Sequence, residues 1–417
     1  MTDLMRDLSQ PCPQCVEAAI GVSSELVIRR LQVRPERLEF VSERIQARAE
    51  RAELGGEVAI VDSPRPAPDP HCRDLTRGPV QMPTVATITP YVVAAPACTR
   101  EGLRLSLQLA RGAARAGGGD WQIEVVGYGP VDGCMTIENG VRLRTLPVDT
   151  PDQRHGRALS WGLLDALGEA DIVHVYEPAT RSGGLALALA VMRGHRVCVT
   201  DGLGEPPGPA DAVEPAELAQ LAIAPSAQAA ARTTTRRPVR VVSAGVDTDF
   251  FGPGNGNRAG VVVAGPGAES VAEKLAAALP DGLRICGEPT EDAPGSGLGG
   301  AQCTARRVLF QRAAVTVHAG SELSTPEVVA VSLLEAMSCG SSVVGIPGAG
   351  LAPYVENGVS GFLVDDLPGL EAMVRRLLGD KPLRERTGRA ARLRACSEWD
   401  LASAGQALLG VYSELLA

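Results

Sequence analysis

The pattern of apolar and polar residues becomes regular near residue 84. From there, short apolar runs typical of buried strands alternate with segments whose apolar residues recur at helical spacing. The predicted strands are residues 85–90, 121–129, 170–178, 195–202, 239–247, 283–287, 315–320 and 342–346, and residues 259–267 combine a strand with a turn. The predicted helices are residues 103–117, 182–194, 269–279, 325–340, 370–380 and 399–417, and residues 221–235 combine a short strand with a helix. Strands alternating with helices predict an α/β fold with parallel sheets.

The alternation is interrupted once by a glycine-rich segment, residues 251–260, and then starts again. We therefore predict two Rossmann-like domains facing a cleft, residues 83–250 and 251–400, followed by a C-terminal helix over residues 401–417. Residues 1–82 lack the pattern and end in a proline-rich linker. They predict a partly helical or loosely ordered extension, which is available for a protein partner.

The predicted helix over residues 325–340 carries two carboxylates in an almost wholly apolar context. A helix that is apolar nearly all round is buried, and a buried carboxylate without a partner costs several kcal/mol. Glu335 therefore requires either an arginine of this protein or the hydroxyl groups of a ligand. Glu327 lies at the start of the helix, at the edge of a parallel sheet where ligands bind. Gly340 is suited to ending the helix.

Composition narrows the classes of partner. The net charge of −9 and a pI of about 5.3 argue against nucleic acid or an anionic membrane as the main partner. No apolar run has the length of a membrane span, and the N-terminus lacks the apolar segment of a signal peptide, so we expect a cytoplasmic protein with reduced thiols. Cys12, Cys15, His71 and Cys72 could bind zinc, but their spacing is irregular, and unrelated thiols are the preferred interpretation.

Several motifs resemble those of GT-B glycosyltransferases of family 4, over residues 84–417. Glu327 and Glu335, followed by Ala-Met-Ser-Cys-Gly, resemble the family's E-x7-E helix. The segment GAGLAPYVENGVSGFLV, residues 348–364, resembles the family's motif after that helix, and AGVD, residues 244–247, resembles its interdomain strand. The segment IVHVY, residues 172–176, is similar to a motif of the N-terminal domain.

The resemblance implies a retaining transfer of a sugar from a nucleotide sugar, without a metal or other cofactor. Glu335 would accept hydrogen bonds from the two ribose hydroxyls, and Glu327 would bind hydroxyls of the transferred sugar. The backbone amides of the helix start would face the sugar and the diphosphate. These amides belong to Val328, Val329, Ala330, Val331 and Ser332.

The chain departs from the family where the diphosphate binds. The family has an arginine directly after the first glycine and a lysine further on, whereas here Gly265 is followed by Pro266 and the only nearby base is Lys274. Gly265 and Lys274 are still candidate donor-binding residues, and Lys274 also fits an exposed helix position. The charge could instead come from Arg181, Arg306 or Arg307. The family's glycine-rich turn of the N-terminal domain is also altered, since residues 201–204 lack its histidine.

The resemblance places the acceptor side in the N-terminal domain. Glu101 and Gly102 occupy the position of the family's glycine loop, although a helix N-terminal turn is the preferred interpretation. His174 ends the strand segment ADIVH, and Arg181 follows that strand at the same edge of the sheet. His174 is either a catalytic residue or a packing residue. The variable segments 91–100 and 135–156 are expected to select the acceptor.

Two functions remain open from sequence alone. One is an active glycosyltransferase that uses a UDP- or GDP-sugar on a small molecule, a lipid carrier or a glycan. The other is a catalytically degenerate protein of the same fold that binds a nucleotide weakly or acts as a partner subunit. A Rossmann oxidoreductase is excluded because no G-x-G-x-x-G with a following acidic residue comes after a predicted strand.

Overall fold

The computed structural model describes residues 82–92, 100–149, 156–168, 170–200, 215–233, 235–265, 268–279, 285–287, 300–319, 331–346 and 351–417. All of them belong to one compact unit, residues 69–206 and 215–417. The predicted extension over residues 1–82, with the candidate zinc ligands, lies outside the described residues apart from residue 82.

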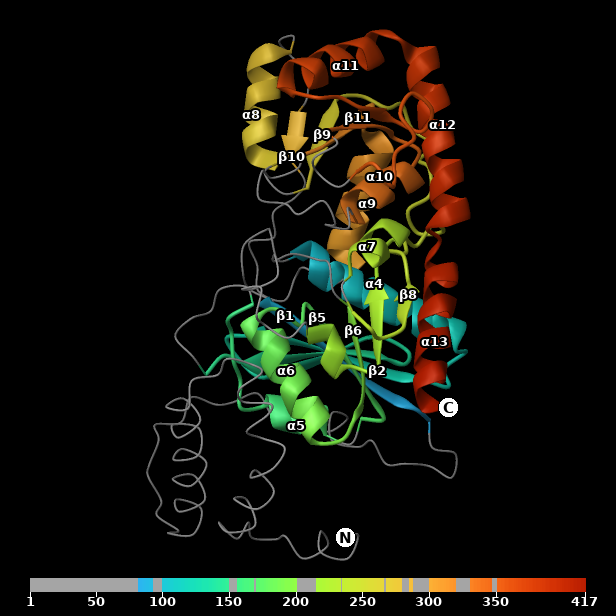
Figure 1. The fold of residues 1–417 in the computed structure, drawn as a ribbon. Helices are drawn as coiled ribbons and strands as arrows, with labels where there is room; N and C mark the ends of the chain where they lie inside the picture. The colour runs from blue at the N-terminus through green and yellow to red at the C-terminus, as the bar shows by residue number, and fades with distance from the viewer. Residues whose placement is uncertain are drawn as a thin grey trace, which may run out of the picture. The chain divides into compact units, whose positions relative to one another are not determined.

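The first half of this unit is built on an eight-stranded sheet in the order β3-β4-β2-β1-β5-β6-β7-β8 (Figure 1). Its strands are β1 (Thr84–Val92), β2 (Gln122–Gly129), β3 (Gly133–Glu138), β4 (Val141–Pro147), β5 (Ile172–Tyr176), β6 (Arg196–Thr200), β7 (Leu221–Ala224) and β8 (Val239–Val241). All pairs are parallel except β3 with β4. The predicted α/β class is thereby confirmed.

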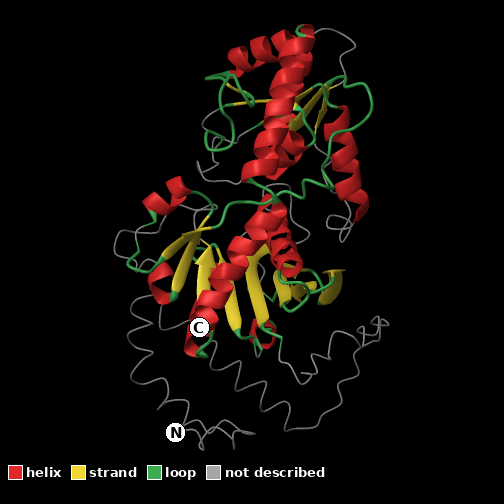
Figure 2. Ribbon diagram, turned by 90° about the vertical axis from the view of Figure 1, so that its right-hand side faces the viewer, coloured by secondary structure: helices red, strands yellow, loops and turns green. Residues whose placement is uncertain are grey.

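Alternating residues of the central strands point to opposite faces of this sheet, and both faces are buried. Val85 and Ile172 pack with helices α4 and α13 on one face, whereas Ala86 and Val173 pack with α5 and α6 on the other. Figure 2 shows α4 and the C-terminal helix α13 on the same side of the sheet. The helices of this half are α4 (Arg100–Ala116), α5 (Leu163–Leu167), α6 (Arg181–Met192) and α7 (Ala227–Arg232), with a 3₁₀ turn η3 (Pro215–Leu218) and the returning α13 (Leu401–Leu416).

One part of the acceptor-selecting segment has regular structure that the sequence reading missed. Residues expected to form a variable loop instead form an antiparallel hairpin of β3 and β4, with the turn at Asn139 and Gly140. Gly140 has a positive φ of 80°, as such tight turns require. The Asn-Gly pair between two alternating segments was the sequence signal for this hairpin.

The second half is built on a five-stranded parallel sheet in the order β10-β9-β11-β12-β13. Its strands are β9 (Val261–Ala264), β10 (Ile285–Gly287), β11 (Val315–His318), β12 (Ser342–Gly345) and β13 (Phe362–Leu363). Its helices are α8 (Ala268–Ala278), α9 (Gly300–Arg312), α10 (Val331–Ser338), α11 (Leu367–Gly379) and α12 (Lys381–Glu398). α9 and α10 pack on one face and α8 and α11 on the other, so the prediction of two Rossmann-like units is confirmed.

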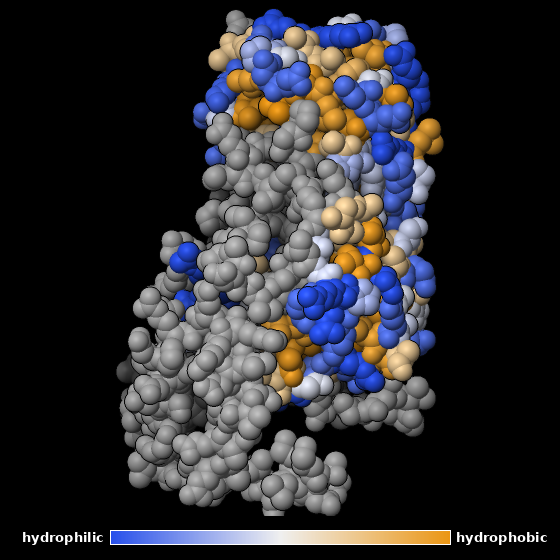
Figure 3. All heavy atoms as spheres, in the orientation of Figure 1, coloured by the Kyte–Doolittle hydropathy of each residue, from blue (hydrophilic) through white to orange (hydrophobic). Residues whose placement is uncertain are grey.

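The chain passes between the two halves twice, at the segments around Val246 and around Asp400, and these two crossing segments pair with each other. The Val246 amide donates to the Trp399 carbonyl at 2.8 Å, and the Leu401 amide donates to the Val246 carbonyl at 2.9 Å. α12 leads into the second crossing and was not predicted as a helix. Its outer edge is hydrophilic (Figure 3), and only a narrow stripe of it is buried, which leaves a weak apolar signal.

Candidate functional site

The short helix α10 is the centre of the candidate site. All of its residues are buried, as the apolar pattern predicted. The helix ends at Ser338, Gly340 in the turn that follows has a positive φ of 75°, and the Ser341 amide donates back to the Ala336 carbonyl at 3.0 Å. β12 follows directly, so the predicted helix, glycine and strand sequence is confirmed.

The side chain of Glu335 has no solvent exposure, and its carboxylate is bound by protein donors. Arg104 of α4 donates to Oε2 at 2.7 Å, and Gln108 donates to Oε1 at 3.3 Å. Arg306 of α9 donates to Oε2 at 3.2 Å and to Oε1 at 3.5 Å. The side chains of Arg104 and Arg306 are only 9% and 5% exposed, so all three charged groups are buried together.

This arrangement answers the question raised by a carboxylate inside an apolar helix. Of the two partners that were possible, arginine or ligand hydroxyls, the structure shows arginine. A carboxylate has about four acceptor positions, and four donor contacts occupy them here. Sequence analysis named Arg306 as a possible source of charge but did not identify Arg104 or Gln108, which lie more than two hundred positions from Glu335 along the chain.

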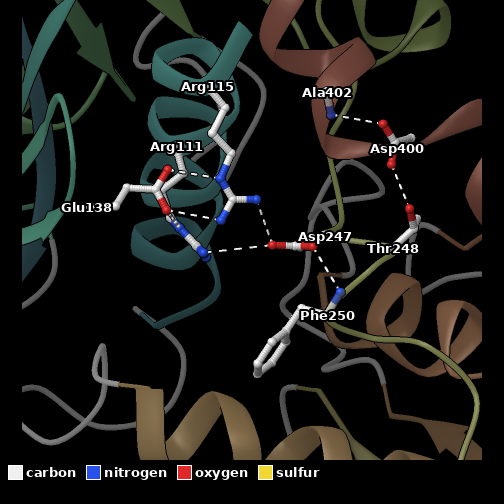
Figure 4. Close-up of polar contacts among 8 residues, drawn as sticks. All are labelled: Arg111, Arg115, Glu138, Asp247, Thr248, Phe250, Asp400 and Ala402. Atoms are coloured by element: carbon white, nitrogen blue, oxygen red, sulfur yellow. Dashed lines mark hydrogen bonds and ion pairs between the residues drawn. The ribbon is translucent and has the colours of Figure 1, made fainter. Parts of the chain in front are cut away.

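Arg104 and Gln108 belong to one polar stripe along α4, in which every member has a defined partner. The stripe consists of Arg104, Gln108, Arg111 and Arg115. Spacings of three and four residues place its members on one side of the helix. The first two contact Glu335, and the last two contact Glu138 and Asp247 (Figure 4). One face of α4 is thus tied both to α10 and to the first crossing segment.

The crossing segment is held by a charge network that Figure 4 shows in full. Arg115 donates to both oxygens of Glu138, at 3.0 and 3.1 Å, and to Asp247 at 2.8 Å. Burial opposes ionisation of Asp247, but hydrogen bonds from Arg115 and from the Phe250 amide outweigh it and hold its pKa below the ordinary value. The network therefore attaches the AGVD segment, residues 244–247, to α4 through charged hydrogen bonds.

On the other side of the same crossing, Asp400 begins α13. The Thr248 hydroxyl donates to Asp400 at 2.6 Å, and the other Asp400 oxygen caps the helix by accepting from the Ala402 amide at 2.9 Å (Figure 4). Asp400 therefore joins the two crossing segments while it satisfies a helix N-terminus.

At the edge of the second sheet, Gly265 lies against His318. Gly265 has a positive φ of 88°, and a Cβ there would come within 2.8 Å of the His318 ring and 2.7 Å of the Ala319 carbonyl. The ends of β9 and β11 are adjacent in the sheet, as the register of Ala264 with His318 shows. The predicted donor-binding Gly265 is therefore at a carboxyl edge of parallel strands, where ligands of α/β folds bind.

The remaining candidates for the donor charge are distributed differently. Lys274 is an exposed residue in the middle of α8, which matches its interpretation as a surface lysine. Arg181 is the exposed first residue of α6. Arg307 lies over the Phe250 ring at 4.6 Å. Of the basic residues considered from sequence, only Arg306 contacts the carboxylate of Glu335.

Two of the predicted backbone donors, Val331 and Ser332, are the first described residues of α10 and are buried. Arg104 also donates to the Ser332 hydroxyl, at 3.3 Å. Glu327 and the predicted donors Val328, Val329 and Ala330 lie outside the described residues. Glu101 and Gly102 lie in the first turns of α4, as the helix-turn interpretation expected.

His174, a catalytic or packing residue by sequence, is completely buried between the first sheet and α13. Its Nδ1 lies 2.9 Å from the Tyr412 hydroxyl, and its Nε2 lies 2.6 Å from the Thr200 hydroxyl. Burial lowers the pKa of His174 to about 3. A neutral ring with both nitrogens bonded and no exposure favours the packing role, which fastens α13 to the sheet.

This environment makes the stability of the chain depend on the protonation of His174. The unfolded chain binds a proton at the ordinary pKa near 6.5 and the folded chain does not, so stability is lost as the pH falls below about 6.5. We expect the difference in unfolding free energy between wild type and His174→Asn to shrink by about 2 kcal/mol from about pH 7 to about pH 5. Urea denaturation at the two pH values measures it, and an unchanged difference would mean that His174 is not held neutral.

Glu177 is a residue that sequence analysis overlooked. It directly follows β5, is buried, and is the only non-glycine residue with a positive φ, 48°, among the described residues. A side chain in this region costs about 1 to 3 kcal/mol and often marks a functional position. Gly183 makes the conformation feasible, since a Cβ at that position would come within 2.2 Å of the Glu177 carbonyl.

Two general features of the described residues concern metal ions and lipid bilayers. No group of three or more His, Cys, Asp or Glu residues gathers there to hold a metal ion. Among the helices of these same ranges, none combines the length and apolar character needed to cross a lipid bilayer.

Comparison with known proteins finds one family model that matches part of this chain. Residues 302–394 match the sequence model of the family described as glycosyl transferases group 1, a range that includes α10 and Glu335. Among curated protein sequences, none matches this chain.

Solved structures cover a larger part of the chain. Sucrose-phosphate synthase from Thermosynechococcus elongatus is 16% identical, with a TM-score of 0.58 over 80% of this chain and 99% of that one. HepE from Anabaena, solved with UDP and glucose, is 15% identical, with a TM-score of 0.54 over 80% of this chain and all of that one. A glycosyltransferase from Rickettsia africae is 12% identical, with a TM-score of 0.53 over 80% and 98%. The fold is therefore the GT-B fold of these proteins, as the sequence resemblance implied.

Proposed function

We propose that this chain is a retaining glycosyltransferase that moves a sugar from a UDP- or GDP-linked donor to a small molecule, a lipid carrier or a glycan in the cytoplasm. The observation that carries the proposal is the position of α10. This helix lies within the range that matches the glycosyl transferase model and carries the second glutamate of the E-x7-E pattern. The similar fold of HepE, which is solved with UDP and glucose, supports the same donor class.

The chemistry assigns a task to each part of the site. Sugar transfer develops positive charge on the anomeric carbon and negative charge on the leaving diphosphate, so preorganised donors must face the diphosphate. In this proposal the start of the E-x7-E helix supplies backbone amides to the diphosphate. In this proposal Glu327 binds hydroxyls of the transferred sugar, Glu335 binds the ribose, and no metal or other cofactor takes part.

A second function is favoured by one specific observation. The Glu335 carboxylate already accepts hydrogen bonds from three protein side chains, which suits a chain that has lost donor binding. Such a chain would act as a binding or partner subunit, with residues 1–82 providing the contact.

The two functions give different results with a panel of UDP- and GDP-sugars. We expect wild type to bind one of them with a Kd of roughly 1 to 100 µM and to release the nucleoside diphosphate slowly in water. Glu327→Gln is expected to keep nucleotide affinity but lower turnover by roughly 100- to 1,000-fold, because a hydrogen bond to the reacting sugar is lost. Calorimetric titration and a nucleoside diphosphate release assay measure the two quantities.

Glu385→Gln serves as the control, since Glu385 is exposed on α12 and, within the part of the chain that the structure describes, pairs only with Lys381, at 3.7 Å. This variant is expected to match wild type. Binding by wild type without any turnover would favour the partner subunit, and the absence of binding to every nucleotide sugar would refute the enzyme.

A further inference from the structure

Arg104 connects the two halves of the chain at the candidate donor site. Its helix α4 follows β1 in the first sheet, whereas Glu335 and Ser332 lie on α10 of the second sheet, 231 and 228 positions away. The guanidinium donates to Glu335 at 2.7 Å and to the Ser332 hydroxyl at 3.3 Å. Arg104 thus reaches both the carboxylate assigned to the donor ribose and the helix turn assigned to the diphosphate.

The acceptor capacity of Glu335 limits what else it can bind. Its two oxygens receive four contacts from Arg104, Gln108 and Arg306, which is all that a carboxylate can accept. Each ribose hydroxyl that binds Glu335 would need one of these positions. A nucleotide can therefore reach Glu335 only if a protein donor leaves.

Arg104 is the donor whose departure leaves Glu335 with a charge partner and with an acceptor position free. Arg306 contacts both carboxylate oxygens from α9, within the same half of the chain, and remains as the counter-charge. A buried carboxylate that keeps an arginine avoids the large cost of an unpaired charge. The released Arg104 side chain, already in contact with the Ser332 hydroxyl, would then lie beside this end of the described part of α10.

We propose that Arg104 exchanges one anionic partner for another when the donor binds: it leaves Glu335 and pairs with the diphosphate. In the free chain it donates to Oε2 of Glu335, and on donor binding it transfers to the diphosphate and leaves that acceptor position to a ribose hydroxyl. This inference rests on the proposed function. It also supplies, from the first half of the chain, the positive charge that is missing where Pro266 follows Gly265.

The exchange predicts two changes in affinity, one for nucleosides and one for nucleoside diphosphates. Arg104→Met removes the competitor for Glu335, so uridine or guanosine is expected to bind roughly ten-fold more tightly than to wild type. The same variant lacks the cation for the diphosphate, so its preference for UDP over uridine, or for GDP over guanosine, is expected to fall roughly 10- to 100-fold. Calorimetric titration with these four compounds measures both effects.

Two further variants make the test specific. Arg111→Met changes the same stripe of α4 at a residue that contacts Glu138 rather than Glu335, and it is expected to leave both quantities at the wild-type values. Arg104→Lys keeps the charge with a different geometry and should retain more of the diphosphate preference than Arg104→Met. Circular dichroism establishes that each variant is folded, and Arg104→Lys carries the test if Arg104→Met is not.

The outcomes separate the exchange from the proposed function. If wild type binds UDP or GDP but the variant at Arg104 changes only one of the two quantities, or neither, the exchange is wrong and the donor class stands. If neither wild type nor the variants bind any of the four compounds, the proposed function and the exchange both fail.

Discussion

Replacing Glu335 with glutamine is expected to lower the free energy of unfolding by about 3 to 5 kcal/mol. The side chain keeps its shape but loses its charge, and Arg104 and Arg306 are left buried without their common carboxylate. The cost arises because two buried guanidinium groups lose the carboxylate that they share. Denaturant unfolding followed by circular dichroism measures the change.

The matched control is again Glu385→Gln, which alters an exposed pair one turn apart on α12. Exposed pairs of this kind contribute about 0.5 kcal/mol or less, so this variant should unfold close to wild type. Equal stability of the two variants would show that the buried cluster is not held together by the charge of Glu335.

Replacing Gly405 with alanine is expected to destabilise the chain by about 3 kcal/mol or more. Helices α4 and α13 cross with their backbones in contact, and a Cβ at Gly405 would come within 2.0 Å of the Gly112 backbone. Because backbone atoms cannot move aside as a flexible side chain can, α13 would have to shift away from α4. Helix α13 also holds Tyr412 against His174, so a shift of α13 would disturb the packing around that histidine as well. Denaturant unfolding gives the magnitude.

Gly410 provides the control on the same helix. A Cβ there meets nothing within 4 Å, so Gly410→Ala should stabilise the chain by about 0.5 to 1 kcal/mol through its higher helix propensity. If Gly405→Ala were stabilising as well, the close crossing of α4 and α13 would be wrong.

The sequence by itself determined the features that depend on local pattern. Apolar runs separated by helical segments predicted the parallel strands, and the apolar context of Glu335 predicted that α10 is buried. Gly340 predicted the end of that helix. These predictions held because burial and helix termination are set by residues within a few positions of one another. The weakly apolar stripe of α12 and the Asn139–Gly140 turn show where the same local reading was incomplete.

The tertiary structure alone decided which groups satisfy the buried polar side chains. The pattern around Glu335 required a partner but could not name Arg104, because the pairing depends on how α4 and α10 are brought together across 231 positions. His174 was predicted at a strand end but lies at the centre of β5, and only the return of α13 places Tyr412 against its ring and leaves it without exposure. Hydrophobic periodicity indicates whether a side chain is buried. The residue that hydrogen-bonds to a buried polar side chain is set by the packing of elements that are distant in sequence.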